Sequence, residues 1–264
     1  KDQINRLSNT ESRVLIYGPT GSGKELIARK IHNQSKRSTN PFIIINAALL
    51  DVEKYEVELF GEERDDGTIS YGALEKATGG TLLIDQVSEI PLETQSKILR
   101  VLTDQKFRRT NGNHDVKVNV RIICSTIKDI REEIHLGNFR EDLFHRLNVI
   151  QVKVEPLSKK IEDIPLLIEY FSKIISDAYN IKKLELNTYI NYLNNYNWPG
   201  NIRELRNLIE RIAILSPGNS SDKVLNIIKE SIKLRENDIF DVNDTLSVPL
   251  KEARESFEKE YLTT

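Results

Sequence analysis

The chain of 264 residues contains one cysteine, no methionine and no long apolar run. A single thiol, Cys124, cannot form an internal disulfide or a cysteine-based zinc site, and its apolar neighbours predict a buried, unreactive group. A membrane-spanning helix needs about 20 apolar residues, which no segment supplies, and the first residues do not resemble a signal peptide. We therefore expect a cytoplasmic protein without a membrane partner. The missing initial methionine predicts an excerpt of a longer chain.

Neither sign of charge dominates, because 38 Lys and Arg residues stand against 40 Asp and Glu residues, for a formal net charge of -2. A module that holds a nucleic-acid backbone typically has a positive field. DNA binding by this segment is therefore not expected. Hydrophobic residues make up 39% and charged residues 30%, which is typical of a globular chain. The length allows one sizeable domain and a smaller satellite.

Short apolar, β-rich runs alternate with helical patterns or loops in the first part of the chain. This alternation predicts an α/β fold with a mostly parallel, five-stranded sheet covered by helices on both faces. Between 107 and 118 the dipeptide Asn111-Gly112 predicts an inserted hairpin. After Pro156 the apolar spacing becomes helical only, which predicts a small all-helical domain. The five predicted strands are 14–17, 42–46, 81–85, 118–125 and 149–154.

A glycine-rich segment between the first predicted strand and a helix has the pattern of a phosphate-binding loop. Its glycines let backbone N–H groups point inward around phosphate oxygens, the helix N-terminus adds a positive potential, and Lys24 reaches the β- and γ-phosphates. A glycine turn that binds nothing is the alternative, and the strand, loop, lysine and helix order counts against it. The predicted nucleotide-binding residues are Gly18, Pro19, Thr20, Gly21, Ser22, Gly23, Lys24 and Glu25.

Two positions in this pattern bear on magnesium. Glu25 stands where a Ser or Thr usually follows the lysine, so that magnesium ligand is missing from the simple pattern. Asp85, at the end of an apolar strand, is placed where an acid that positions Mg²⁺ is expected. We therefore predict Asp85 as the metal-binding acid.

Several segments together resemble the AAA+ domain of sigma-54-dependent activators, over essentially the whole chain. In that family the phosphate loop ends in Gly-Lys-Glu, so Glu25 becomes part of the match. The resemblance implies an AAA+ nucleotide-binding core at 1–157, a helical lid at 158–233 and, at 234–264, a connector toward a DNA-binding domain outside this chain. The matching segments are GPTGSGKELIARKIH, INAALL, ELFG, GGTLLIDQ, FREDLFHRLNV and WPGNIREL.

By position, the resemblance also implies ATP and Mg²⁺ as cofactors and assembly into a hexameric or heptameric ring. Arg140 and Arg146 match arginine fingers that reach the γ-phosphate bound to the neighbouring subunit; two solvated arginines on a helix are the alternative. Arg203 matches the sensor arginine of the lid, with a surface salt bridge as its alternative. Asn46 resembles the residue that switches the catalytic glutamate.

The chain departs from that family at three places. Gln86 replaces the glutamate that polarises the attacking water, and an amide cannot accept a proton; losing such a base typically costs about 10²- to 10⁴-fold in rate. Ile127 stands where an Asn is usual. After Gly61 the residues 62–71 replace the GAFTGA loop that touches the sigma factor, a pattern that resembles NtrX-type response regulators.

These features favour an ATP-binding, self-assembling central module of a two-component transcription regulator. It would act as a nucleotide-dependent oligomerisation switch with weak or no hydrolysis. An active ATPase that remodels sigma-54 RNA polymerase at promoters is the main alternative, and a scaffold that binds no nucleotide is a third. Contacts with DNA and a sensor kinase are expected only through domains outside this chain, and RNA polymerase remains a candidate partner.

Overall fold

The computed structural model describes residues 2–51, 54–182, 184–216 and 221–238. Contacts within the chain define two compact units. The α/β unit comprises 1–160 together with 198–203, and the helical unit comprises the described residues of 161–197 and 204–264. The predicted connector at 234–264 lies outside the described residues from 239 onward.

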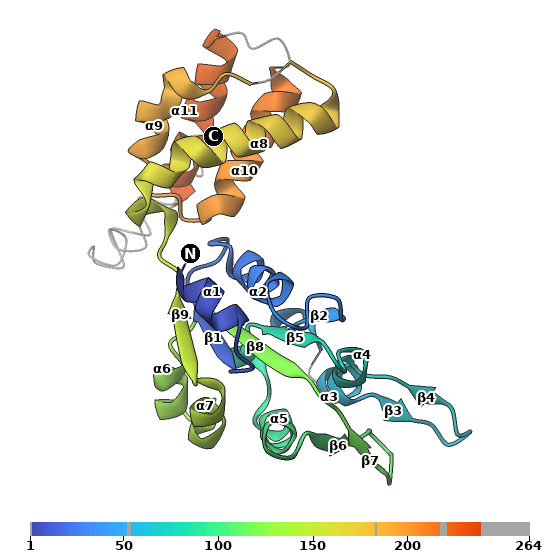
Figure 1. The fold of residues 1–264 in the computed structure, drawn as a ribbon. Helices are drawn as coiled ribbons and strands as arrows, with labels where there is room; N and C mark the ends of the chain where they lie inside the picture. Colours follow the sequence, from blue (N-terminus) through green and yellow to red (C-terminus); the bar gives the residue numbers. More distant parts are fainter. Residues whose placement is uncertain (1, 52–53, 183, 217–220, 239–264) are drawn as a thin grey trace, which may run out of the picture. The chain divides into compact units, whose positions relative to one another are not determined.

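The α/β unit is built on a five-stranded sheet whose strands are all parallel, in the order β2-β5-β8-β1-β9 (Figure 1). This confirms the predicted fold class. The fourth predicted strand begins later than expected, because residues 118–120 form the connection that returns from a hairpin. The strands are β1 (Val14–Tyr17), β2 (Phe42–Asn46), β5 (Thr81–Asp85), β8 (Arg121–Thr126) and β9 (Ile150–Lys153).

Helices cover both faces of this sheet, as Figure 1 shows. Side chains alternate along a strand, so Val14 and Ile16 of β1 pack beneath α1 and α2, whereas Leu15 joins the larger core on the other face. The first face is covered by α1 (Asp2–Ser8) and α2 (Lys24–Asn33). The second face is covered by α3 (Tyr55–Phe60), α4 (Ala73–Lys76), α5 (Leu92–Asp104), α6 (Ile130–His135) and α7 (Glu141–Leu147).

Two short hairpins extend from the α/β unit. The predicted one forms between β6 (Lys106–Arg108) and β7 (Asp115–Lys117), with Asn111 in the left-handed region at φ 59°. Its loop, 109–114, is longer than the two-residue turn that Asn-Gly suggests. Residues 62–70 form the second hairpin, in which β3 (Glu62–Glu63) pairs with β4 (Ile69–Ser70). The loop of the first hairpin is bonded to the start of the second, because Thr110 O accepts from Glu63 N–H (3.0 Å) and Thr110 N–H donates to Gly61 O (2.9 Å).

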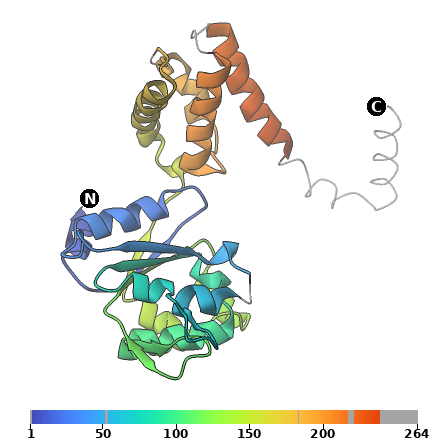
Figure 2. The ribbon, with the colours of Figure 1, turned by 90° about the vertical axis from the view of Figure 1, so that its right-hand side faces the viewer.

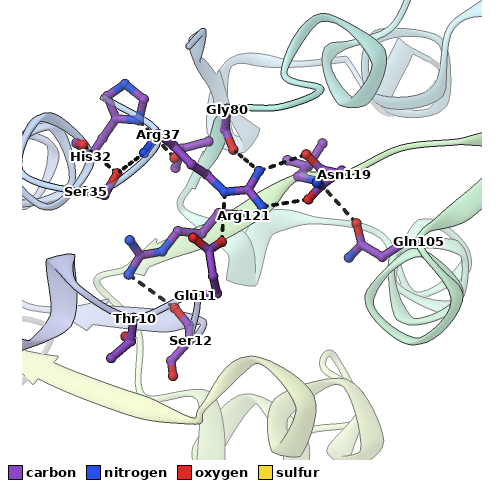
Figure 3. Close-up of polar contacts among 12 residues, drawn as sticks. Thr10, Glu11, Ser12, His32, Ser35, Arg37, Gly80, Gln105, Asn119 and Arg121 are labelled. Carbon is purple, nitrogen blue, oxygen red and sulfur yellow. Dashed lines mark hydrogen bonds and ion pairs between the residues drawn. The ribbon is translucent and has the colours of Figure 1, made fainter. Parts of the chain in front are cut away.

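A polar cluster ties the first helix to the edge of the sheet where β5 and β8 begin (Figure 3). Arg37 forms an ion pair with Glu11 (2.8 Å) and donates to the Asn119 carbonyl oxygen (2.9 Å). The buried Arg121, the first residue of β8, donates to the Leu7 carbonyl oxygen (2.8 Å) at the end of α1. Burial lowers the pKa of Arg121, and Glu11 acts in the opposite direction. The cluster fixes the segment between α1 and β1.

The helical unit contains four α-helices among the described residues: α8 (Ile164–Tyr179), α9 (Ile190–Asn194), α10 (Asn201–Leu215) and α11 (Ser221–Asp238) (Figure 2). The predicted apolar stripes form its core, with Ile168 and Ile175 of α8 and Ile209 of α10 buried. Ile174, which has the same helical spacing, is not part of this core, since it is 44% exposed. None of the described helices has the length and apolar character needed to cross a membrane.

Candidate functional site

The glycine-rich loop connects β1 to α2 at the carboxyl end of the sheet. Gly21 and Gly23 have φ angles of 73° and 92°, in the left-handed region that residues with a side chain rarely adopt. At Gly18 the limit is space, because an added Cβ would lie 2.6 Å from the Val154 carbonyl oxygen. The three glycines are thus required by conformation or by packing.

Lys24 begins α2 and folds its side chain back over the loop. The residue is only 8% exposed, and its ammonium donates to the carbonyl oxygens of Gly18 (2.9 Å) and Pro19 (3.0 Å). Burial lowers the pKa of Lys24, the Asp85 carboxylate raises it and the Arg203 guanidinium lowers it. A cation that is partly removed from water, as the Lys24 ammonium is here, attracts an anion more strongly than a fully hydrated cation does.

Asn46 and Asp85 end the neighbouring strands β2 and β5, and Ser125 is the penultimate residue of β8, so all three lie at the carboxyl ends of the strands. Asn46 and Asp85 are paired in register between β2 and β5. Ser125 of β8 donates its hydroxyl hydrogen to Asp85 Oδ1. Asn46 accepts from Ala48 N–H (3.1 Å) and so caps the short helix η1 (Ala47–Leu49). The carboxylate of Asp85 is therefore oriented by a neighbouring strand and lies close enough to Lys24 to affect its pKa.

Gln86 follows Asp85 where the strand turns into the short helix η3 (Val87–Glu89). Its backbone lies in the left-handed region, with φ 56° and ψ 52°. Such a conformation costs a non-glycine residue about 1–2 kcal/mol. Gln86 O accepts from Glu89 N–H (2.9 Å), which holds the turn. The backbone conformation at position 86 is thus fixed by the turn, and its side chain is the carboxamide of Gln86.

Glu25 and the arginines differ in how they relate to this site. Glu25 lies on the exposed side of α2 and pairs with Arg29 (2.8 Å). Arg203 donates its backbone N–H to Gly21 O (3.3 Å), while its side chain is exposed. Arg140 and Arg146 lie on or beside α7, which covers the sheet face opposite α2. The structure therefore brings Arg203 to the loop and places the other two arginines elsewhere.

The two arginines at α7 are exposed but not equivalent. The Arg140 guanidinium donates to both oxygens of Asp142 (3.0 and 2.7 Å) and to Ser96 Oγ (3.1 Å), and the Asp142 hydrogen bond raises the pKa of Arg140. Arg146 lies in the last turn of α7, where its carbonyl oxygen accepts from Arg13 (3.3 Å). The Arg140 side chain is thus held by hydrogen bonds within its own chain.

Sequence reasoning missed two contributors to the site. Ser125, noted only for its strand, is the residue that orients Asp85. Asn201, part of the WPGNIREL segment, has a side chain that donates to Thr20 O (2.9 Å) in the glycine-rich loop. The turn motif Trp-Pro-Gly-Asn drew attention to this position, but no sequence pattern links residues this far apart.

Comparisons with known proteins agree with this arrangement. The model of the Sigma-54 interaction domain family matches residues 1–153, and that of the AAA+ ATPase lid domain matches 158–231. The chain belongs to the sigma-54 interaction domain family. The resemblance stated from the sequence is therefore confirmed, including its NtrX branch.

Several similar relatives within this family are named as NtrX or NtrX-like regulators. The nitrogen assimilation regulatory protein NtrX of Azorhizobium caulinodans is 43% identical over 98% of this chain and 58% of its own length. A putative NtrX-like response regulator of Rickettsia felis is 42% identical over 100% of this chain and 57% of its own length. The chain thus spans a little under three fifths of the curated relatives that it matches.

Solved structures of NtrX from Brucella abortus are similar over 99% of this chain and 59% of their own. The complex with ADP has a TM-score of 0.84 at 46% identity, and the complex with ATP has 0.82 at 45% identity. The fold assigned from the sequence is thus that of a sigma-54 interaction domain followed by a helical lid.

Proposed function

We propose that this chain is the ATP-binding, self-assembling central module of an NtrX-type two-component regulator. It acts as a nucleotide-dependent oligomerisation switch with weak or no hydrolysis. Residues 1–157 form the nucleotide-binding core, 158–233 the lid and 234–264 the connector toward a DNA-binding domain. The observation that carries the proposal is a complete phosphate loop beside Asp85, combined with Gln86 at the next position.

The residues present fit a nucleotide phosphate. The loop 18–25 supplies backbone N–H groups at the start of α2, and Lys24 supplies a buried ammonium. The ATP and ADP complexes of the Brucella relative support the same ligand class. Arg203, whose backbone already contacts the loop, is the proposed sensor of the bound nucleotide.

The site also fits Mg²⁺ carried by the nucleotide. Within the described residues, His, Cys, Asp and Glu side chains nowhere gather in the groups of three or more that hold an ion by themselves. Mg²⁺ in phosphate sites is commonly held by one or two carboxylates and the phosphates, and Asp85 supplies one carboxylate. Bound there, the ion would neutralise phosphate charge.

Gln86 is the reason to separate binding from turnover. A carboxamide can orient a water molecule but cannot take its proton, so the general base of hydrolytic relatives is missing. Binding energy alone suffices for a switch. At a ligand concentration 100 times Kd, linkage stabilises the bound form by about 2.7 kcal/mol. Asn46 is paired with Asp85 in the sheet, and in this proposal its side chain would contact the residue at position 86.

Assembly is proposed to use Arg140 and Arg146 in trans, in a hexameric or heptameric ring. Both side chains are exposed and therefore accessible to a neighbouring subunit. Arg140 would exchange Asp142 for the neighbour's nucleotide. Partners of the whole regulator, namely DNA, a sensor kinase and RNA polymerase, belong to the same proposal.

The test is single-turnover ATP hydrolysis by the wild type and by Gln86→Glu at high protein concentration, with ATP affinity measured for both. We expect similar affinities and a rate at least about 10²-fold higher in Gln86→Glu, because the substitution restores a proton acceptor. Lys24→Ala is the control that should lose binding. Equal rates would reject the switch and favour an active ATPase, and absence of binding by the wild type would favour a scaffold.

A further inference from the structure

The carbonyl oxygens of the phosphate loop from Gly18 to Gly21 all accept hydrogen bonds. Lys24 Nζ donates to those of Gly18 and Pro19. The Asn201 side-chain Nδ2 donates to Thr20 O (2.9 Å), and the Arg203 backbone N–H donates to Gly21 O (3.3 Å). Half of this set therefore comes from the first turn of α10, far along the chain.

Tied carbonyl oxygens matter because a loop of this type binds anions through its N–H groups. Each peptide plane carries its C=O opposite its N–H, so holding the oxygen on one side presents the hydrogen to the other. A loop with free carbonyl groups must be ordered when the ligand arrives, at a cost of about 1–2 kcal/mol per backbone residue. Contacts that order it beforehand remove this cost from the binding step.

Asn201 is built into this arrangement with both ends of its carboxamide. Its Nδ2 donates to Thr20 O, and its Oδ1 accepts from Leu157 N–H (2.8 Å). The residue is 2% exposed and lies at φ 52°, a left-handed conformation that asparagine tolerates better than most residues. The residue before Asn201 also lies close to the loop, because a Cβ added at Gly21 would lie 2.2 Å from Gly200 O.

We propose that Asn201 is a positioning residue of the phosphate loop, holding the Thr20 carbonyl group outward so that the loop is ordered before nucleotide binds. Nucleotide binding and attachment of the turn 200–203 to the loop are then thermodynamically linked, each strengthening the other. The inference rests on the proposed function, since it assigns a new residue to that nucleotide site. It differs from a purely structural role for a buried asparagine in predicting an effect on affinity.

Two substitutions separate these roles. Asn201→Asp is nearly isosteric and keeps the acceptor for Leu157 N–H, but it loses the donor to Thr20 O. Asn201→Gly removes both hydrogen bonds and tolerates the left-handed backbone. Asn197→Asp, an exposed position four residues away in sequence, is the control for added negative charge.

ATP affinity is measured by calorimetry, and hydrogen exchange of Leu157 and of segment 198–203 is measured with and without ATP. We expect affinity to fall about 2- to 12-fold in Asn201→Gly, the worth of one neutral hydrogen bond, and at least as much in Asn201→Asp. Asn197→Asp should stay within about 2-fold of the wild type. ATP should slow exchange in the 198–203 segment of the wild type more than in either variant.

The results distinguish this inference from the proposed function. Wild-type ATP binding with unchanged affinity and unchanged exchange in both Asn201 variants overturns the positioning role and leaves the proposed function intact. Wild type that binds no ATP overturns the proposed function. In that case faster exchange at 198–203 in nucleotide-free Asn201→Gly still supports the attachment of this turn to the loop through Asn201, and unchanged exchange there rejects it. If Asn201→Gly fails to fold, Asn201→Asp alone decides.

Discussion

At the scale of single residues, Cys124 shows how burial sets chemistry. It lies in β8 between apolar neighbours and is 1% exposed. A thiolate there would lose its hydration, and burial raises the pKa of the Cys124 thiol to about 12. The thiol is therefore neutral at physiological pH, and the sequence-based expectation that it is buried is confirmed.

Cys124 should make stability depend on alkaline pH. The unfolded thiol ionises near its ordinary pKa of 9.0, whereas the folded thiol stays protonated to about 12. Because the folded pKa is raised, the contribution is intact below pH 9 and is lost as pH rises further, by about 1.4 kcal/mol per pH unit. Urea unfolding of wild type and Cys124→Ala between pH 8 and 10.5 measures this. If the free energy of unfolding falls with pH at the same slope in both proteins, the prediction is contradicted. The constant loss of stability from the cavity in Cys124→Ala does not affect this comparison of slopes.

At the scale of elements, the strands of the sheet were predictable because each is a short, β-rich run bounded by turn residues. The glycine-rich loop between β1 and α2, and the place of Asp85 at the end of β5, were predictable for a similar reason, since each depends on neighbours in sequence. What failed needed contacts between distant segments. Val118 and Val120 are buried without being in the strand, and Ile174 fits the helical spacing but is exposed. The spacing of apolar residues along a helix indicates its apolar face, but the elements packed against the helix decide which part of that face is buried.

The contacts of the site side chains show the same limit. The sequence placed Asn201 and Arg140 in motifs, but it could not indicate that Asn201 bonds to Thr20 O or that Asp142 engages Arg140. A side-chain hydrogen bond is specified by the angles of several elements at once. For this reason the residue types of the candidate site were predicted, and their roles remain predictions for experiment.

Two left-handed glycines offer a matched pair for the loop. Gly21 (φ 73°) packs against Gly200 O, whereas Gly67 (φ 79°) in the β3–β4 hairpin has nothing within 4 Å of an added Cβ. Gly67→Ala should cost about 1 kcal/mol from backbone strain alone. Gly21→Ala should cost more and weaken ATP binding at least tenfold, because the loop must also move away from residue 200. Denaturant unfolding and calorimetry measure the two effects. Equal unfolding costs and equal affinities would mean that the loop relaxes freely.

At the scale of the whole molecule, the question is how a nucleotide bound to one copy affects another. The net charge of -2 gives no strong attraction or repulsion between copies. Specific contacts must therefore provide the proposed assembly. The exposed arginines at α7 suit this role unequally, because Arg140 must first leave Asp142, whereas Arg146 forms no ion pair within the part of the chain that the structure describes.

This inequality predicts opposite effects for two substitutions at α7. Arg146→Ala removes a charged donor and should weaken ATP-dependent assembly about 10- to 100-fold, the worth of a hydrogen bond to a charged group, with little change in ATP affinity of the dilute chain. Asp142→Asn weakens the hold on Arg140 and should strengthen assembly. Sedimentation velocity with a non-hydrolysable ATP analogue measures both, with the exposed Arg6→Ala in α1 as control. If all three variants assemble as the wild type does, α7 is a solvated helix, and the interface must be sought on another face.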